Sequence, residues 1–351
     1  MGSGAFAWLV GLGVALAPPD PNHSIRYQFQ QTQMAVPVKL VLYAPDNATA
    51  NRAAERVFQR LAQLNAILTD YDPDSELRRL CDTAGEGKAV PVSEELWRVL
   101  VHAQSLAERT EGAFDVTVGP VVRVWRLARQ FHKMPPQELL DRMRTVVGYR
   151  FVRLVPEQRA VELRKPGMRL DLGGIAKGFA LDEALKTLRN EGIVCAMVEA
   201  GGDIGLGAPP PGKPGWIIGL APPERDSPPA LYLCLSGCFV ATSGDLWQFV
   251  ELGGKRYSHI VDPRTGIGLT DRITVTVVAP EGMAADGLST AVSVLGPEKG
   301  LRLVEQTPGA AAFIVVNVGG QARTFHSSAW NKLPEVKPLS PDAHGGSPSP
   351  P

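Results

Sequence analysis

The sequence predicts an α+β protein, and three observations support this fold class. Amphipathic helical segments and short apolar strands both occur, but they do not follow the strict strand–helix–strand rhythm of a doubly wound fold. A hydrophobic fraction of 44% and a charged fraction of 21% are typical of a globular protein rather than a disordered or fibrous one. The 351 residues suffice for one large domain or two ordinary ones, and no internal repeat is apparent.

The N-terminal segment has the features of a secretory signal. Ala5 to Ala17 form an apolar run, AFAWLVGLGVALA, whose end has the small-residue pattern of a cleavage site. The run is too short to span a bilayer comfortably as a helix. No Lys or Arg precedes it, Pro18 follows it directly, and no cysteine follows where a lipid anchor would attach. We expect residues 1–17 to be a signal peptide and the protein to be exported, periplasmic or membrane-associated; otherwise the run is an apolar terminus and the protein cytoplasmic.

The remaining chain divides by composition into three parts. Residues 18–32 are polar and contain Pro, which indicates a linker. Residues 33–333 carry the periodic apolar segments and are expected to form the folded domain. Residues 334–351 are dominated by Pro, Ser and Gly and offer few apolar side chains to bury, so we expect a disordered tail.

Helices are expected where apolar residues recur on one face. Val57, Leu61, Leu64 and Leu68 have this spacing within Asn47 to Leu68. Ser93 is placed to cap a second helix that stops at Gly112. The further helices are expected at Pro135 to Gly148, Lys177 to Glu191 and Ala284 to Leu295.

Strands are expected where short apolar runs lie between turn residues. Phe151–Val155 and Ala160–Leu163 should form a hairpin, and Gly192 should end a helix before the strand Ile193–Val198. Surface loops are expected at 209–215 and 222–229. The later strands are expected at Trp216–Leu220, Leu231–Leu235, Ile273–Ala279 and Ala311–Val316.

Charge and cysteine content exclude two classes of function. The 36 basic and 36 acidic residues balance, so there is no basic excess of the kind that binds nucleic acid. No CxxC pair is present, which argues against a zinc site. The four cysteines are more consistent with buried thiols than with a disulfide. They are Cys81, Cys195, Cys234 and Cys238.

Two glycine-rich stretches are candidates for an anion site. In DLGGIAKG (171–178), paired glycines precede a helix whose first amides are free to bind an anion, and Lys177 adds a positive charge. The spacing matches neither a Walker loop nor the GxGxxG fingerprint. EAGGD (199–203) ends an apolar strand and could line the same crevice with backbone amides. Either stretch alone is more often structural.

Three further segments carry polar side chains suited to chemistry. The turn in YSHIVDPRTG (257–266) is expected to bring His259, Asp262 and Arg264 together. Asp286 and Thr290 lie one helical turn apart, so both oxygens share a face suited to Mg²⁺, although an incidental Thr is the more common explanation. GAFDVTVGP (112–120) leaves a helix through a glycine and exposes Asp115.

Taken together and in order, these segments resemble the ApbE family, the FAD:protein FMN transferases. GAFDVTVGP, DLGGIAKGFALD, EAGGDIG, ATSGD, YSHIVDPRTG and ADGLSTA carry the resemblance, as does YDPDSEL from Tyr71. It runs from about Met34 to Val316. It implies an α+β fold of the T-fold-like kind, with FAD in a cleft between two lobes.

The resemblance also implies roles for particular residues. His259 and Asp262 would be catalytic, and the Gly174 carbonyl, Asp286 and Thr290 would hold Mg²⁺. The family's early Met-Gly-Thr appears here as Met34-Ala35-Val36, and Ser289 stands where some members have a metal-ligating Asp. The residues expected to contact FAD are Met34, Tyr71, Ala113, Phe114, Asp115, Asp171, Lys177, His259 and Ile260.

The implied reaction splits FAD, attaches FMN through a phosphoester to a Thr or Ser hydroxyl of an acceptor protein, and releases AMP. The acceptor would be a flavin-carrying subunit of an exported or membrane redox system, so membrane association would come through it or through the N-terminal run. His259, with an ordinary pKa near neutrality, or an acidic residue would be the base. The alternatives are a Mg²⁺-dependent FAD pyrophosphatase and a non-catalytic FAD-binding carrier.

Overall fold

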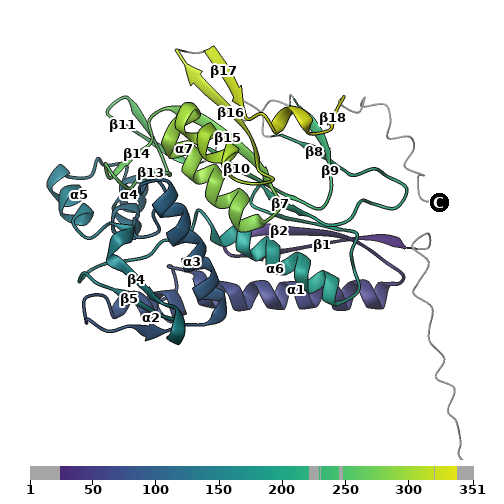
Figure 1. Ribbon diagram of the computed structural model, residues 1–351, viewed down its shortest axis with the longest axis horizontal. Coiled ribbons are helices and arrows are strands. Elements are labelled where there is room, and N and C mark those ends of the chain that lie inside the picture. The colour runs from purple at the N-terminus through teal and green to yellow at the C-terminus, as the bar shows by residue number, and fades with distance from the viewer. Residues whose placement is uncertain (1–23, 221–228, 230, 245–247, 320, 338–351) are drawn as a thin grey trace, which may run out of the picture.

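A computed structural model describes residues 24–220, 229, 231–244, 248–319 and 321–337 (Figure 1). The expected signal peptide, the first part of the expected linker, most of the loop expected at 222–229 and most of the expected tail lie outside these residues. No helix among the described residues is long and apolar enough to cross a membrane.

The central element is an eight-stranded sheet in which every neighbouring pair is antiparallel. The α+β prediction is thereby confirmed, since a doubly wound fold would have parallel strands. In spatial order the strands are β1 (Ile25–Gln33), β2 (Val36–Ala44), β6 (Ala196–Ala200), β7 (Asp203–Leu206), β10 (Phe239–Gly244), β15 (Arg272–Ala279), β16 (Ala311–Val318) and β17 (Gln321–His326).

Three helices, α1 (Asn47–Leu68), α6 (Ala176–Asn190) and α7 (Gly282–Glu305), cover one face of this sheet (Figure 1). Side chains alternate along each strand, so Leu40 and Leu42 join the helix-side core while Val41 packs on the other face. That second face is covered by a small sheet and a short helix around Trp216 and Trp330. These are β8 (Trp216–Gly219), β9 (Tyr232–Leu235), β18 (Glu335–Val336) and η4 (Trp330–Lys332).

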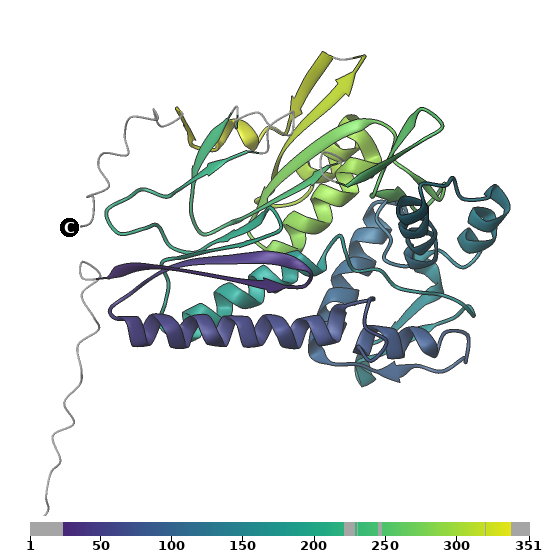
Figure 2. The same cartoon turned by 180° about the vertical axis from the view of Figure 1, so that it is seen from behind.

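A second group of elements lies beside one end of the helices (Figure 2). Part of it has its own core, in which Trp125 and Leu140 are fully buried and Val261 nearly so. The group comprises α2 (Glu76–Asp82), β3 (Val90–Pro91), α3 (Glu94–Arg109), α4 (Gly119–Phe131), α5 (Gln137–Arg144), η2 (Tyr149–Phe151), β4 (Val152–Val155), η3 (Pro156–Gln158), β5 (Ala160–Leu163), β11 (Phe249–Leu252), β12 (Lys255–Ser258), β13 (Val261–Asp262) and β14 (Ile267–Gly268).

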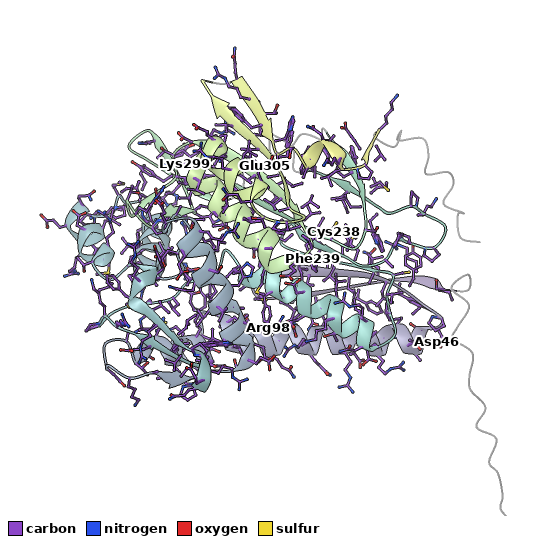
Figure 3. The ribbon with its side chains drawn as sticks, in the orientation of Figure 1. Asp46, Arg98, Cys238, Phe239, Lys299 and Glu305 are labelled. Carbon is purple, nitrogen blue, oxygen red and sulfur yellow. The ribbon has the colours of Figure 1, made fainter. Side chains whose placement is uncertain are left out.

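Capping residues place the helix starts where the sequence predicts them. Asp46, labelled in Figure 3 at the start of α1, accepts a hydrogen bond from Thr49 N at 2.7 Å. Ser93 caps α3 by accepting from Leu96 N at 3.2 Å. These contacts satisfy amides that a helix start leaves unpaired. The expected helix at Asn47 to Leu68 and the hairpin around Pro156 are both confirmed.

Four expectations about elements are corrected. Residues 25–32, expected as linker, form β1, because a polar edge strand can pair on one side and face solvent on the other. In the expected tail, Glu335 and Val336 form β18 against β9. The helix expected at 135–148 is only α5, and the strand expected from Ile193 begins at Ala196.

The cysteines among the described residues are free, as expected. Cys81 is buried, and Cys195, Cys234 and Cys238 are partly buried. Burial raises the pKa of the Cys238 thiol to about 11, so this thiol stays protonated at neutral pH.

Helices α6 and α7 approach so closely that a glycine is required at the crossing. A Cβ at Gly178 would lie 2.1 Å from the carbonyl oxygen of Gly282. We therefore expect Gly178→Ala to lower the free energy of unfolding by at least about 1–3 kcal/mol, because backbone atoms must move to relieve the overlap. Chemical denaturation measures the change.

The matched control is Asn190→Ala, at the exposed end of the same helix. It should change the free energy of unfolding by less than about 0.5 kcal/mol. An equal effect of the two substitutions would contradict a backbone contact at the crossing.

Candidate functional site

Lys177 joins three motifs that are far apart in the sequence. Its ammonium nitrogen, in the first turn of α6, lies 2.6 Å from Asp203 Oδ2 and 3.3 Å from Asp286 Oδ1. Asp203 begins β7, and Asp286 lies in the second turn of α7. The glycine-rich stretches and the helix carrying Asp286 therefore meet at one point, although only Lys177 and Asp286 were expected in the site.

This cluster is buried and carries unequal charge. Burial raises the pKa of Asp203 to about 6, with Lys177 acting in the opposite direction. Burial opposes the ammonium of Lys177, yet the two carboxylates raise the pKa of Lys177 above its ordinary value. Two carboxylates thus face one ammonium at neutral pH, and the excess negative charge favours an additional cation.

Hydroxyl oxygens suited to a hard cation lie on the same helix as Asp286 and on the neighbouring strand β10. Asp286 Oδ2 accepts a hydrogen bond from Gly178 N at 2.9 Å. The backbone of Gly174 touches Thr290, since a Cβ at Gly174 would lie 2.9 Å from Thr290 Oγ1. Ser243 Oγ lies 2.7 Å from Ser289 Oγ and 3.3 Å from Thr290 Oγ1.

The donor set fits magnesium. No group of three His, Cys, Asp or Glu side chains suited to a metal occurs among the described residues. Here the Asp286 carboxylate shares a helix with the Thr290 hydroxyl, and the backbone of Gly174 lies against Thr290, so the donors available are oxygens. Mg²⁺ takes few protein ligands of this kind and keeps positions for water and phosphate. The predicted set of Gly174, Asp286 and Thr290 is brought together by the fold.

An exposed aromatic ring adjoins Asp171. The guanidinium of Arg126 lies 4.4 Å from the ring centre of Tyr71, and Arg126 Nη2 lies 2.6 Å from Asp171 Oδ2. Arg126 also pairs with Asp70. Tyr71 is 73% exposed, so it offers a flat face to a planar ligand. Arg126 was not expected from the sequence because its helix, α4, was not foreseen.

Met34 lies at the other side of the Lys177 cluster. Met34 and Ala35 have φ values of 51° and 61° and form the tight turn between β1 and β2. Met34 lines a small cavity together with Lys177 and Ala180. The predicted cofactor contact at Met34 is therefore close to Lys177.

The loop after α3 contributes structure rather than reactive side chains. Ala113, Phe114 and Asp115 are buried. Asp115 accepts hydrogen bonds from Thr117 N at 2.8 Å and Tyr149 N at 2.7 Å, while burial raises the pKa of Asp115. A ligand contact by this loop would come from its backbone atoms.

His259 is held as a neutral base. Its Nδ1 lies 3.1 Å from the carbonyl oxygen of Gln248, which can only accept, so Nδ1 carries the proton and Nε2 the free lone pair. Burial, together with the positive charges of Arg129 and Lys177, lowers the pKa of His259 to about 4. The adjacent Ile260 is buried.

Asp262 pairs with one of its two expected neighbours, Arg264. Its carboxylate binds Arg264 through two contacts of 2.9 Å, and its carbonyl accepts from Gly266 N at 2.8 Å. The hydrogen-bond partner of His259 is instead the Gln248 carbonyl. Through Arg264 and Gly266, Asp262 stabilises the turn.

A cavity of about 510 Å³ lies elsewhere, between α6 and the start of α7. Arg98 and Phe239, both labelled in Figure 3, line it together with Asp182 and Glu281. None of the predicted site residues lines it, and its charged side chains have both signs. The predicted site residues therefore gather at the Lys177 cluster and not at this cavity.

Comparison with known proteins agrees with the order of the motifs. The model of the ApbE family matches residues 34–314. The FAD:protein FMN transferase of Haemophilus influenzae is 35% identical over 298 residues, which cover 83% of this chain and 86% of the relative. The FAD:protein FMN transferase of Escherichia coli (strain K12) is 31% identical over 81% of this chain and 83% of the relative.

Solved structures show the same fold. The flavin transferase ApbE from Vibrio cholerae superposes with a TM-score of 0.79 and 28% identity, over 88% of this chain and 99% of the other. The apo form of the flavinyl transferase ApbE from Pseudomonas stutzeri superposes with a TM-score of 0.78 and 28% identity, over 88% of this chain and 97% of the other.

Proposed function

This chain belongs to the ApbE family, and we propose that it is a Mg²⁺-dependent FAD:protein FMN transferase. It cleaves FAD, attaches FMN through a phosphoester to a Thr or Ser hydroxyl of an acceptor protein, and releases AMP. One observation carries the proposal beyond the family. Lys177 joins Asp203 and Asp286 beside the hydroxyls of Ser243 and Thr290, a cluster suited to a pyrophosphate with its metal.

In the proposed reaction, His259 is the base that deprotonates the hydroxyl of the acceptor protein. Its free Nε2 takes the proton from the incoming hydroxyl, and the hydroxyl oxygen bonds to the phosphorus of the FMN half. The bond between that phosphorus and the bridging oxygen breaks, and the electron pair leaves with AMP. A neutral imidazole is required for this step, which the lowered pKa of His259 ensures at neutral pH.

The other residues bind and orient. Tyr71, backed by Arg126, offers its face to a planar ring of FAD, and Lys177 contributes fixed positive charge near the phosphates. Asp286, Thr290 and the Gly174 carbonyl would hold Mg²⁺, which when bound stabilises negative charge on the phosphate oxygens.

The test is incubation with FAD, Mg²⁺ and a peptide from a candidate acceptor, a flavin-carrying subunit of a redox system. Covalent flavin on the peptide, detected by mass spectrometry, is the expected result. Release of AMP and free FMN whether or not peptide is present would instead identify a pyrophosphatase. FAD that stays intact would identify a carrier.

We also propose that the protein is exported, on the strength of the apolar run at residues 5–17. Mass spectrometry of the N-terminus after expression in a bacterial host tests this. Cleavage near Ala17 with recovery outside the cytoplasm is expected, and an intact cytoplasmic chain would contradict export.

A further inference from the structure

Arg129 is a partly buried cation with one buried guanidinium nitrogen that has no partner among the described residues. It lies in the last turn of α4, three residues after Arg126 and therefore on the same side of the helix. Arg126 is bound by Asp70 and Asp171, whereas Nη1 of Arg129 is buried and has no hydrogen-bond partner among the residues that the structure describes. A buried guanidinium nitrogen without a partner is costly, which indicates a ligand rather than a structural role.

The position of α4 places Arg129 between two parts of the site. Trp125 donates a hydrogen bond from Nε1 to the Gly266 carbonyl at 2.9 Å, and its ring centre lies 5.0 Å from that of Tyr257. Helix α4 is therefore fixed to the segment that carries His259. The charge of Arg129 acts on His259, Tyr71 and Asp171. Arg129 is therefore close both to the proposed base and to the exposed ring.

The surroundings favour an anionic ligand. Arg126 and Arg129 together balance the charge of Asp70 and Asp171, but both carboxylates are bound by Arg126, so Nη1 of Arg129 still lacks an acceptor that a ligand oxygen would supply. Burial and the charge of Arg126 lower the pKa of Arg129, which means that an anion beside it would be stabilised. Phosphate oxygens match the planar fork of a guanidinium better than any other common anion except carboxylate.

We propose that Arg129 binds a phosphoryl oxygen of FAD in this site. The proposal rests on the proposed function in that FAD is the ligand, but it concerns binding and not transfer. The competing explanation is that Arg129 only stabilises the C-terminal end of α4 through its charge, as basic residues in a last turn do.

The experiment measures binding of FAD and riboflavin, without acceptor, by flavin fluorescence. Arg129→Gln is expected to raise the Kd for FAD about ten- to a hundredfold, the effect of losing one charge-assisted contact. Riboflavin has no phosphate, so its Kd should change by less than about twofold. Arg129→Lys keeps the charge but not the fork, and an intermediate Kd for FAD is expected.

Arg123→Gln is the matched control, because Arg123 is exposed on the same helix. It should leave both Kd values unchanged. Repeating the titrations with FMN and AMP identifies which phosphate Arg129 contacts. Thermal unfolding shows whether each variant is folded, and the Lys variant keeps the test valid if the Gln variant is not.

Two results would overturn the proposal. An unchanged Kd for FAD in the Gln variant means that Arg129 does not contact the ligand, and an equal loss for FAD and riboflavin means that it only supports the helix. Failure of FMN transfer by the unchanged protein would affect the proposed function alone, since FAD binding is measured separately. Failure of the unchanged protein to bind FAD would overturn both.

Discussion

Asp286→Ala is expected to reduce FMN transfer by about a hundredfold to a thousandfold, even at saturating Mg²⁺. Asp286 supplies the carboxylate among the three predicted metal ligands, because Gly174 and Thr290 offer a carbonyl and a hydroxyl. Without it, the metal that neutralises the phosphates loses its only charged protein ligand. Transfer to an acceptor peptide at increasing Mg²⁺ concentrations measures both the rate and the Mg²⁺ requirement.

Loss of Asp286 also affects folding, and the design must separate the two effects. Asp286 is buried and pairs with Lys177 and Gly178 N, and removing one member of a buried ion pair commonly costs about 3–5 kcal/mol. Asp286→Asn retains an oxygen that can accept from Gly178 N while removing the charge. We expect this variant to stay folded in thermal unfolding and still to lose transfer.

Asp203→Asn is the matched control, because Asp203 also pairs with Lys177 but is not a predicted metal ligand. Its remaining oxygen can accept from Thr242 N, as Asp203 Oδ1 does at 3.0 Å. The rate should fall, but the Mg²⁺ concentration for half-maximal transfer should stay within about threefold. Full turnover by Asp286→Ala at saturating Mg²⁺ would show that the metal is held elsewhere.

Two parts of the candidate site, the predicted metal ligands and the ion pair beside them, differ in how far the sequence could predict them. Asp286 and Thr290 are one helical turn apart, so local periodicity alone places their oxygens on one face. The pairing of Lys177 with Asp203 is a different matter, since it depends on β7 lying beside α6. The sequence suggested that the stretch 199–203 lines the same crevice through its backbone amides, but no local pattern predicted the contact between the Asp203 side chain and Lys177.

The missed helix α4 shows that some signal was present and misread. Val121, Val124, Trp125 and Ala128 are buried at helical spacing, and Pro120 stands where proline favours a helix start. Because α4 was not foreseen, neither Arg126 nor Arg129 was considered for the site. The strand β1 also carried a signal, since Ile25, Tyr27 and Phe29 alternate with polar residues, and Tyr27 and Phe29 pack against the core.

His259→Gln is expected to reduce transfer by about a hundredfold to ten-thousandfold, the usual contribution of a positioned base. His259 is also a predicted FAD contact, so the Kd for FAD should rise, but by much less than the rate falls, because the base acts on the hydroxyl of the acceptor. Single-turnover transfer to an acceptor peptide measures the rate, and fluorescence titration measures FAD binding. Unchanged transfer would move the base to another residue.

The pH dependence distinguishes a buried imidazole from an exposed one. The base is the neutral form, so its contribution is present above the pKa of His259 and is lost as pH falls through that pKa. Burial beside the Gln248 carbonyl, with Arg129 and Lys177 nearby, lowers the pKa from 6.5 to about 4. The rate of the unchanged protein divided by that of His259→Gln removes the effects of other titrating groups.

Between pH 8 and pH 5 this ratio should fall by only about a tenth, because most of His259 is still neutral at pH 5. An imidazole with the ordinary pKa would lose about thirtyfold over the same range, since the neutral fraction falls about tenfold per pH unit below the pKa. The two outcomes are far apart within a pH range in which the fold can be checked by circular dichroism. A large fall would contradict the burial argument but leave His259 as the base.

Asp262→Asn separates the base from the turn that carries it. The Asp262 carboxylate is bound by Arg264 and the His259 imidazole by the Gln248 carbonyl, so loss of the carboxylate should loosen the turn and lower the rate by less than about tenfold. The pH dependence of the rate ratio should not change, because the contact between His259 and Gln248 does not involve Asp262. If Asp262→Asn instead raised the pH at which transfer is lost, Asp262 would act on the imidazole, and the two residues would form a catalytic pair after all.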